Sequence, residues 1–316
     1  MSYQLVAELS EKAVTVGTVG TVGTVGTLCR VLDVSRSGYY GSRQRAQAAP
    51  KVCATSIQLK AEFAASGRVY GSRRLGAVLR SKGLCIGRYR VRRLMREHRL
   101  RALWRRKFIH TTDSGHALPV SDNVLARRFN PSRPNQAWVS DITYIRTRSG
   151  WLYLAVVLDL YARKVVGWAM APTMHAELVC AALQLAIAQR QPGPGLMVHS
   201  DRGSQYASAL HQALLARHGL VGSMSRKGNC WDNAVMERFF LSLKTQRVWQ
   251  RDYANHAEAM TDIADYIVGF YNSVRLHSKL GNLPPNAFEQ KSAIKQPIAV
   301  SEKTLPAQCA NRVLPL

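Results

Sequence analysis

The stretch Gly195–Lys244, GLMVHSDRGSQYASALHQALLARHGLVGSMSRKGNCWDNAVMERFFLSLK, decides the fold. Its apolar start, Leu196–Val198, predicts a short buried strand, which ends at an acid, Asp201. The pair Arg202–Gly203 then breaks the strand. Thirty-five residues separate Asp201 from a second acid, Glu237, which lies in a segment of helical periodicity. The stretch therefore predicts one acid at a strand end and another on a helix.

The predicted helix has a polar edge beside a buried stripe. With Asp232 as its expected N-cap, Asn233, Glu237 and Lys244 fall within roughly 40° of one another around the helix axis. The neighbouring stripe is apolar and consists of Met236, Phe240 and Leu243. An unpaired carboxylate at such a margin is costly, so Glu237 needs a partner, and a metal ion shared with Asp201 would supply one.

A third acid lies upstream in the segment AWVSDITYI, Ala137–Ile145, which alternates like a strand. One predicted face holds Val139, Asp141, Thr143 and Ile145, and the other holds Trp138, Ser140, Ile142 and Tyr144. An acid in the middle of a strand is unusual, because an apolar residue is expected there. Three carboxylates on two strands and a helix form an oxygen-ligand set that suits magnesium. Two such ions can clamp the attacking and leaving oxygens of a phosphodiester.

The motifs WVSDITYI, GWLYLAVVLDLYARKVVGWAM, HSDRGSQY, SRKGNCWDNAVMERFF and FYNSVRLHSKLGNLPPNAFE occur in this order along the chain. In these motifs the chain resembles a DDE transposase of the retroviral-integrase superfamily, and specifically the second-frame transposase of the insertion-sequence-three family. The resemblance spans roughly residues 131–289, with weaker similarity back to Leu28. It implies a catalytic acid triad of Asp141, Asp201 and Glu237. It also places the family's basic residue, seven positions after the Glu, at Lys244.

The resemblance further implies an α/β fold, an RNase H-like integrase core with a mixed five-stranded sheet and flanking helices, after a basic helix-turn-helix region. The implied activity is DNA cleavage and strand transfer at insertion-element ends. The implied cofactor is Mg²⁺ or Mn²⁺, as two ions. The implied partners are double-stranded DNA, as terminal inverted repeats and target, and a first-frame transposase product, in an oligomeric DNA complex. The implied location is the bacterial cytoplasm, in association with the nucleoid.

The charge balance agrees with a polyanionic partner. Forty-four Lys and Arg against nineteen Asp and Glu give a net charge of +25 over 316 residues. Such a charge favours DNA, RNA or an anionic membrane surface as partner. No apolar run approaches the ~20 residues of a membrane span. The six dispersed cysteines show no CxxC or Cys/His spacing, so reduced structural thiols in a cytoplasm are expected and a zinc site is not.

The basic residues concentrate before the acid triad. Two amphipathic helices are predicted around residues 75–79 and 91–95, and residues 68–107 carry fifteen Lys and Arg against one acid, Glu97. A solvated surface normally mixes signs, so this one-sign surface favours nucleic-acid binding. The candidate DNA contacts are Arg73, Arg74, Arg90, Arg92, Arg93 and Arg96 here, with Asn233 and Lys244 near the triad.

The chain divides into six expected regions. Residues 1–27 form an N-terminal segment with a Val-Gly-Thr repeat, which predicts a flexible tract. The others are a possible small helix-turn-helix (28–48, alternatively one interaction helix), the basic helix-turn-helix-like domain (52–110), a linker (111–136), the catalytic core (137–290) and a tail (291–316).

Three other groups of residues in the sequence are candidate sites. The run His199–Asp201 has the letters of a hydrolase triad, but neighbouring strand residues face opposite ways, which excludes one. Asp159 ends a strand beside a turn and is interpreted as structural. Tyr271, Asn272, Arg275 and His277 follow an amphipathic helix and fit either substrate contact or packing.

Two other functions stay open. One is a nuclease of the same fold that hydrolyses DNA without rejoining it, and the long basic region argues against it. The other is an inactive, element-derived DNA-binding protein, and the intact triad argues against that.

Overall fold

The computed structural model of the chain describes residues 2–15, 24–47, 53–103, 121–226 and 230–294. The chain separates into two compact units, Met1–Ala61 and Glu62–Leu316. Much of the Val-Gly-Thr repeat lies outside the described residues, as do residues 295–316 of the predicted tail 291–316. Residues 291–294 belong to a helix that ends at Ile294, so the predicted tail began four residues too early.

The first unit holds three helices, α1 (Ser2–Thr15), α2 (Val25–Val31) and α3 (Arg36–Gln47), and the start of α4 (Ala54–Ala65). Helix α2 begins inside the Val-Gly-Thr repeat, because the Thr24 side chain accepts a hydrogen bond from the backbone N–H of Thr27 and caps it. The prediction of a flexible tract up to residue 27 was therefore wrong for its last turn. A small core of Val6, Cys29 and Tyr39 joins α1, α2 and α3.

The basic region contains α5 (Ser72–Ser81) and α6 (Arg88–Glu97). Of the predicted stripes, Leu75 and Leu79 on α5 and Val91, Leu94 and Met95 on α6 are buried, and Val78 on α5 is half-buried. The amphipathic interpretation of both helices is confirmed.

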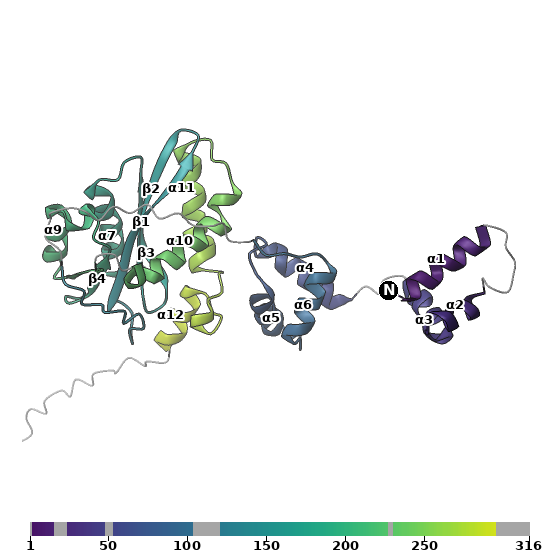
Figure 1. Cartoon of the computed structure of the whole chain (residues 1–316). Helices are drawn as coiled ribbons and strands as arrows, with labels where there is room; N and C mark the ends of the chain where they lie inside the picture. Colours follow the sequence, from purple (N-terminus) through teal and green to yellow (C-terminus); the bar gives the residue numbers. More distant parts are fainter. Residues whose placement is uncertain (1, 16–23, 48–52, 104–120, 227–229, 295–316) are drawn as a thin grey trace, which may run out of the picture. The chain divides into compact units, whose positions relative to one another are not determined.

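The second unit also holds a five-stranded sheet in the order β3-β2-β1-β4-β5 (Figure 1). Its strands are β1 (Ala137–Thr147), β2 (Gly150–Asp159), β3 (Lys164–Ala171), β4 (Met197–Ser200) and β5 (Val221–Met224). Strands β1, β2 and β3 pair antiparallel, whereas β4 pairs parallel with both β1 and β5. This is the mixed five-stranded sheet expected from the sequence.

Helices cover both faces of the sheet, as alternating strand residues require. On one face lie α7 (Ala176–Arg190), α8 (Ser204–Ala207) and α9 (Ala209–Arg217), packed on Trp138, Val157 and Val166. Gly167 permits the close approach of α7, because a Cβ there would lie 2.3 Å from the carbonyl oxygen of Ala182.

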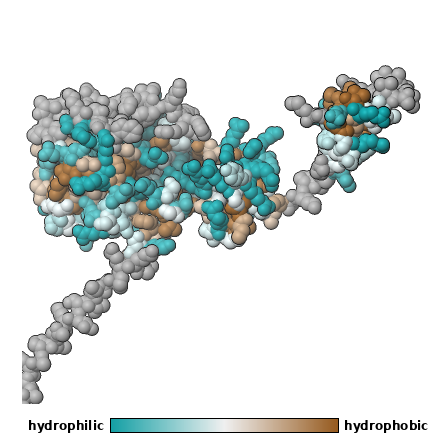
Figure 2. Space-filling view, turned by 60° about the horizontal axis from the view of Figure 1, so that its bottom comes forward, coloured by the Kyte–Doolittle hydropathy of each residue, from teal (hydrophilic) through white to brown (hydrophobic). Residues whose placement is uncertain are grey.

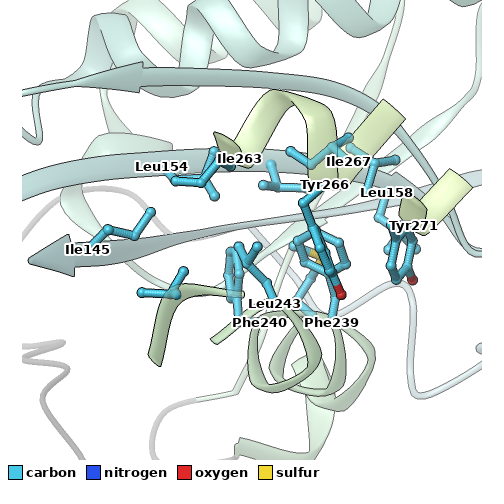
Figure 3. Close-up of a cluster of buried hydrophobic side chains, with 14 of the residues drawn as sticks. Ile145, Leu154, Leu158, Phe239, Phe240, Leu243, Ile263, Tyr266, Ile267 and Tyr271 are labelled. Carbon is cyan, nitrogen blue, oxygen red and sulfur yellow. The ribbon is translucent and has the colours of Figure 1, made fainter. Parts of the chain in front are cut away.

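On the opposite face lie α10 (Ala234–Gln246), α11 (His256–Asp265) and η3 (Tyr266–Asn272). Figure 3 shows Phe239, Phe240 and Leu243 of α10 meeting Ile145 and Leu154 of the sheet. The short turns η1 (Cys230–Asn233), η2 (Val248–Gln250) and η4 (Ser278–Leu280) and helix α12 (Pro285–Ile294) complete the described elements.

Val139 and Ile145 belong to the core under α10, whereas Trp138 and Ile142 face α7. The predicted alternation of β1 is thus confirmed, and it turns Asp141 towards the face that carries α10.

Candidate active site

The sheet register sets Asp141 and Asp201 side by side. Strands β1 and β4 run parallel, with Val139 opposite His199. Each acid lies two residues further along its chain, so the two acids lie at the same level along neighbouring strands. Asp141 is within β1, and Asp201 directly follows the last residue of β4.

The pKa of Asp141 reflects this crowding. Burial raises it well above the ordinary value of 3.8, and the charge of Asp201 raises it further. The backbone N–H of Ile142, which donates to Asp141 Oδ1 at 2.8 Å, and the ammonium of Lys244 lower it in part. The charge of Glu237 adds to the increase. The charges of Asp201 and Glu237 therefore both act on the carboxyl group of Asp141.

Asp201 is oriented by the turn that follows it. Its Oδ1 accepts a hydrogen bond of 2.9 Å from the backbone N–H of Gly203, the residue that caps α8. A Cβ on Gly203 would lie 3.0 Å from that same oxygen, so the turn favours a glycine.

Glu237 lies in the first turn of α10 and is exposed to solvent. Within the described part of the chain, no three His, Cys, Asp or Glu side chains stand close enough to hold a metal ion. The donor set of three carboxylates suits a hard divalent cation, because such an ion would offset the burial and the Asp201 charge that raise the pKa of Asp141. The chemistry of the three acids fits such an ion, although their side chains have not converged on one point.

Lys244 stands at the opposite end of α10 from Glu237. Its ammonium lies 4.5 Å from the ring centroid of Tyr144. Burial lowers the pKa of this ammonium, and the charge of Asp141 raises it in part, so Lys244 belongs to the neighbourhood of the acids. The structure thus places Lys244 within the electrostatic reach of Asp141.

Asn233, the fourth polar residue predicted beside the triad, is buried and occupies the N-cap position of α10. Neither its side-chain oxygen nor its nitrogen makes a hydrogen bond to any residue that the structure describes. Because the Asn233 side chain is buried in this conformation, it cannot contact DNA. Buried polar atoms without hydrogen bonds, such as its Oδ1 and Nδ2, are uncommon in proteins.

The expectation that Asp232 caps the helix was wrong by one residue. Asp232 lies in η1, fully buried, and serves as an acceptor for an adjoining segment. Its Oδ1 accepts from Arg127 Nε at 2.9 Å, and its Oδ2 accepts from Asn123 Nδ2 at 2.8 Å. The backbone N–H of Arg226 donates to the same Oδ2 at 3.1 Å. Asp232 therefore ties residues 123–127, predicted as linker, to the start of α10.

Tyr206 of α8 is a further residue near the acids that sequence reasoning missed. Its buried hydroxyl shares a 3.0 Å hydrogen bond with Ser140 Oγ. Burial raises its pKa well above 10, and the charges of Asp141 and Asp201 raise it further. Its position in the motif HSDRGSQY, five residues after Asp201, was the available signal.

The hydrolase-like run forms no triad. His199 Nδ1 and Nε2 contact Ser223 Oγ at 2.9 Å and Ser225 Oγ at 3.1 Å, and burial lowers the pKa of His199 to about 4. Ser200 Oγ donates instead to the backbone carbonyl of Asp201. His199 is therefore a neutral core residue at physiological pH.

Asp159 and Asn272 both make hydrogen bonds that hold parts of the fold together. Asp159 accepts hydrogen bonds from the backbone N–H groups of Asn135 and Tyr161, which agrees with its structural interpretation. Asn272 bonds both backbone groups of Val165, at 3.0 and 2.9 Å, and so fastens η3 to β3.

The arginines predicted to contact DNA lie mainly on the solvent side of their helices. On α5, Arg73 is exposed, whereas Arg74 is half-buried with its guanidinium 5.6 Å from the Tyr70 ring centroid. On α6, the exposed ones are Arg90, Arg92, Arg93 and Arg96. In Figure 2, hydrophilic residues cover much of the helical region that holds α5 and α6.

No helix in the described part of the chain is long and apolar enough to cross a membrane. Among the described residues, Cys29, Cys53, Cys85 and Cys180 are free cysteines.

Comparison with known protein families assigns residues 131–230 and 218–285 to the integrase core domain and residues 55–108 to an HTH-like domain. Among solved structures, the chain is similar to the HTLV-2 integrase catalytic core domain in complex with magnesium, at 14% identity and a TM-score of 0.41. That match covers 51% of this chain and 99% of the other. A chain of the simian T-cell lymphotropic virus intasome matches over 78% of this chain and 77% of its own, at 16% identity and a TM-score of 0.44.

Two curated relatives are much more similar in sequence. The transposase InsF for insertion sequence IS3A of Escherichia coli (strain K12) is 45% identical over 271 residues, which cover 84% of this chain and 93% of the relative. An uncharacterized 31 kDa protein of the insertion element IS600 of Shigella sonnei is 44% identical over 84% of this chain and 98% of its own length. The chain belongs to the family of IS3-type insertion-sequence transposases.

Proposed function

We propose that Asp141, Asp201 and Glu237 form the active site of a DNA-cleaving and DNA-joining transposase, a polynucleotidyl transferase. The observation that carries this proposal is the equal level of Asp141 and Asp201 on neighbouring parallel strands, where burial and mutual charge raise the pKa of Asp141. Strongly perturbed carboxylates at one edge of a sheet are typical of functional sites.

In the proposed reaction, water attacks a phosphodiester at the element end, and the bond to the 3′ oxygen breaks to leave a 3′-OH. That hydroxyl then attacks a second phosphodiester, forming one phosphorus–oxygen bond while another breaks. The three acids would hold a divalent cation, Mg²⁺ or Mn²⁺, and two ions are proposed. When bound, such ions polarise the phosphodiester and stabilise its developing charge. Lys244 would hold a phosphate beside the acids.

The proposed partner is double-stranded DNA, both the terminal inverted repeats and the target, with the basic surface of α5 and α6 as its docking site. A first-frame product is proposed to supply end specificity, because two ends must be held together and avidity favours an oligomer. Footprinting of the chain alone and of its fusion to that product, on a terminal inverted repeat, tests this division of labour.

The decisive experiment compares the wild type with Asp141→Asn, Asp201→Asn and Glu237→Gln, using DNA that carries the element's terminal inverted repeats. Each substitution removes an anionic ligand with little change of shape, so cleavage and joining are expected to disappear while DNA affinity remains. Asp252→Asn is the matched control, because that carboxylate is 74% exposed and pairs with Arg148. Substantial activity in any of the three variants would refute the assignment.

Precleaved ends separate the two alternatives. A transposase joins them to target DNA, whereas a nuclease of the same fold does not. A protein that binds DNA but neither nicks nor joins it, with either Mg²⁺ or Mn²⁺, would be an inactive derivative.

A further inference from the structure

The tip of the β1–β2 hairpin carries an exposed row of aromatic and basic side chains. Tyr144 of β1 is 36% exposed and Trp151 of β2 is 43% exposed, which is unusual for residues of this size in a sheet. Arg146 is also exposed. Their neighbours Ile145 and Leu152 point the other way and are buried in the core under α10. The row therefore lies on a sheet face that solvent reaches.

Four side chains lie next to one another along this row, in the spatial order Lys244, Tyr144, Trp151 and Arg146. Lys244 Nζ lies 4.5 Å from the centroid of the Tyr144 ring, and the Tyr144 and Trp151 rings meet edge to face at 5.2 Å and 89°. The Arg146 guanidinium lies 5.3 Å from the Trp151 centroid. The strand register supports this order, because Arg146 is directly opposite Trp151. We call Lys244, Tyr144, Trp151 and Arg146 the hairpin row.

The hairpin row begins at the candidate active site. In the described strands, β1 pairs with β4 only over Ala137–Val139, so the β1 edge beyond Val139 is open on that side. Lys244 belongs to the last turn of α10, its ammonium lies 4.5 Å from the centroid of the Tyr144 ring, and the charge of Asp141 acts on it. A strand of DNA whose phosphodiester lies at the acids would thus meet Lys244 first and the aromatic rings next.

The composition of the hairpin row selects the ligand class. Aromatic faces stack on nucleic-acid bases, and flanking cations attract phosphates. Stacking needs a base face that is not covered by its neighbours in a duplex, so the row suits unpaired nucleotides. A chain with a net charge of +25 and two cations in the row complements a polyanion. An apolar protein partner would leave Arg146 and Lys244 without opposite charges.

We propose that the hairpin row binds unpaired nucleotides next to the phosphodiester held at the acids, by stacking their bases on Tyr144 and Trp151. The row would stabilise a locally opened DNA end. This inference rests on the proposed function for the location of the scissile bond.

The test measures binding of the full chain to two duplexes in a chelator, where no cleavage occurs. One duplex is blunt, and the other has a short unpaired end with 2-aminopurine as a reporter of stacking. Wild type is expected to prefer the unpaired end and to quench the reporter. Trp151→Leu and Tyr144→Leu should each weaken binding to the unpaired end roughly ten-fold, with no change for the blunt duplex. Trp151→Phe should retain most of the binding and quenching.

The matched control is Leu210→Ala on α9, an apolar side chain that is 50% exposed and remote from the row in sequence. It should behave as wild type on both duplexes. Equal losses on both duplexes, or no loss from either leucine variant, would overturn the inference. So would a change in self-association of Trp151→Leu in sedimentation with unchanged DNA binding, since the row would then be a protein interface.

Failure here is distinguishable from failure of the proposed function. If wild type cleaves and joins DNA but the leucine variants keep their preference for unpaired ends, only the hairpin row is refuted. If the acid variants retain cleavage, the active-site assignment fails whatever the binding data show.

Discussion

Replacement of Asp232 by Asn tests whether one buried carboxylate holds the segment that leads into α10. The Asp232 side chain is 0% exposed and accepts from Arg127, Arg226 and Asn123. In the Asn variant, one oxygen becomes an NH₂ group that faces donors. The least costly orientation puts that group at Oδ1, which forfeits the 2.9 Å bond from Arg127 Nε and the 3.4 Å bond from Arg226 Nη2.

A hydrogen bond to a charged group contributes about 1.5–3 kcal/mol. The two arginines are 45% and 57% exposed and regain solvent, so the lower end of that range applies to each bond. The free energy of unfolding should then fall by about 3 kcal/mol. For a domain of 150–250 residues, this corresponds to a decrease in Tm of roughly 6–12 °C.

The assay is thermal unfolding of the full chain, followed by near-UV circular dichroism at pH 7. Asp252→Asn serves again as the control, because its exposed ion pair with Arg148 should leave Tm unchanged. A decrease no larger than that of the control would refute the reasoning that the Asp232 contacts stabilise the core.

The same carboxylate gives a pH signature. Burial on its own would raise the pKa of Asp232, but hydrogen bonds from Arg226 and Arg127 outweigh it and lower the pKa from 3.8 to about 2. Because the folded pKa is below the unfolded one, the stabilisation is complete above about pH 4 and is lost as the pH falls towards 2. The Tm difference between wild type and Asp232→Asn should therefore close across that window.

Three further outcomes are expected. Gly167→Ala should lower the free energy of unfolding by about 3 kcal/mol, because the new Cβ would meet the Ala182 carbonyl oxygen, whereas Gly193→Ala in open space should not. Reversal of Arg92, Arg93 and Arg96 to Glu should weaken DNA binding for all sequences and flatten a log–log salt slope of roughly −5, which a titration from low to high salt measures. Residual activity of the acid variants should be higher in Mn²⁺ than in Mg²⁺, since Mg²⁺ demands near-ideal octahedral geometry.

Much of the catalytic fold could be predicted because its signals are local. The alternation of β1 and the apolar run before Asp201 follow directly from burial on one or both faces of a strand. These local patterns could not show that Asp141 and Asp201 lie at the same level of neighbouring strands. That arrangement depends on a parallel pairing between segments 60 residues apart, seen at Val139 and His199.

The role of Asp232 was missed for a related reason. An acid before a helix ordinarily caps it, and nothing local to the sequence reveals that Arg127, 105 residues away, binds the carboxylate instead. Similarly, the contact between Lys244 and Tyr144 joins residues 100 positions apart on α10 and β1, so it depends on how that helix packs on the sheet.

The structural acids of this core differ from the candidate catalytic acid Asp141 in their ion pairs with arginine. Asp232 and Asp262 each have two arginine partners, and Asp159 accepts two backbone N–H groups and pairs with Arg190. Among the described residues, Asp141 forms no ion pair of this kind and instead faces Asp201, so its pKa is raised well above the ordinary value. A fold that pairs its other buried acids with arginines and offsets the Asp141 charge only in part, through the Ile142 N–H and the Lys244 ammonium, carries a cost in stability. A bound cation would relieve that cost, which is why Asp141, which has no ion pair with an arginine among the described residues, is the acid expected to recruit metal.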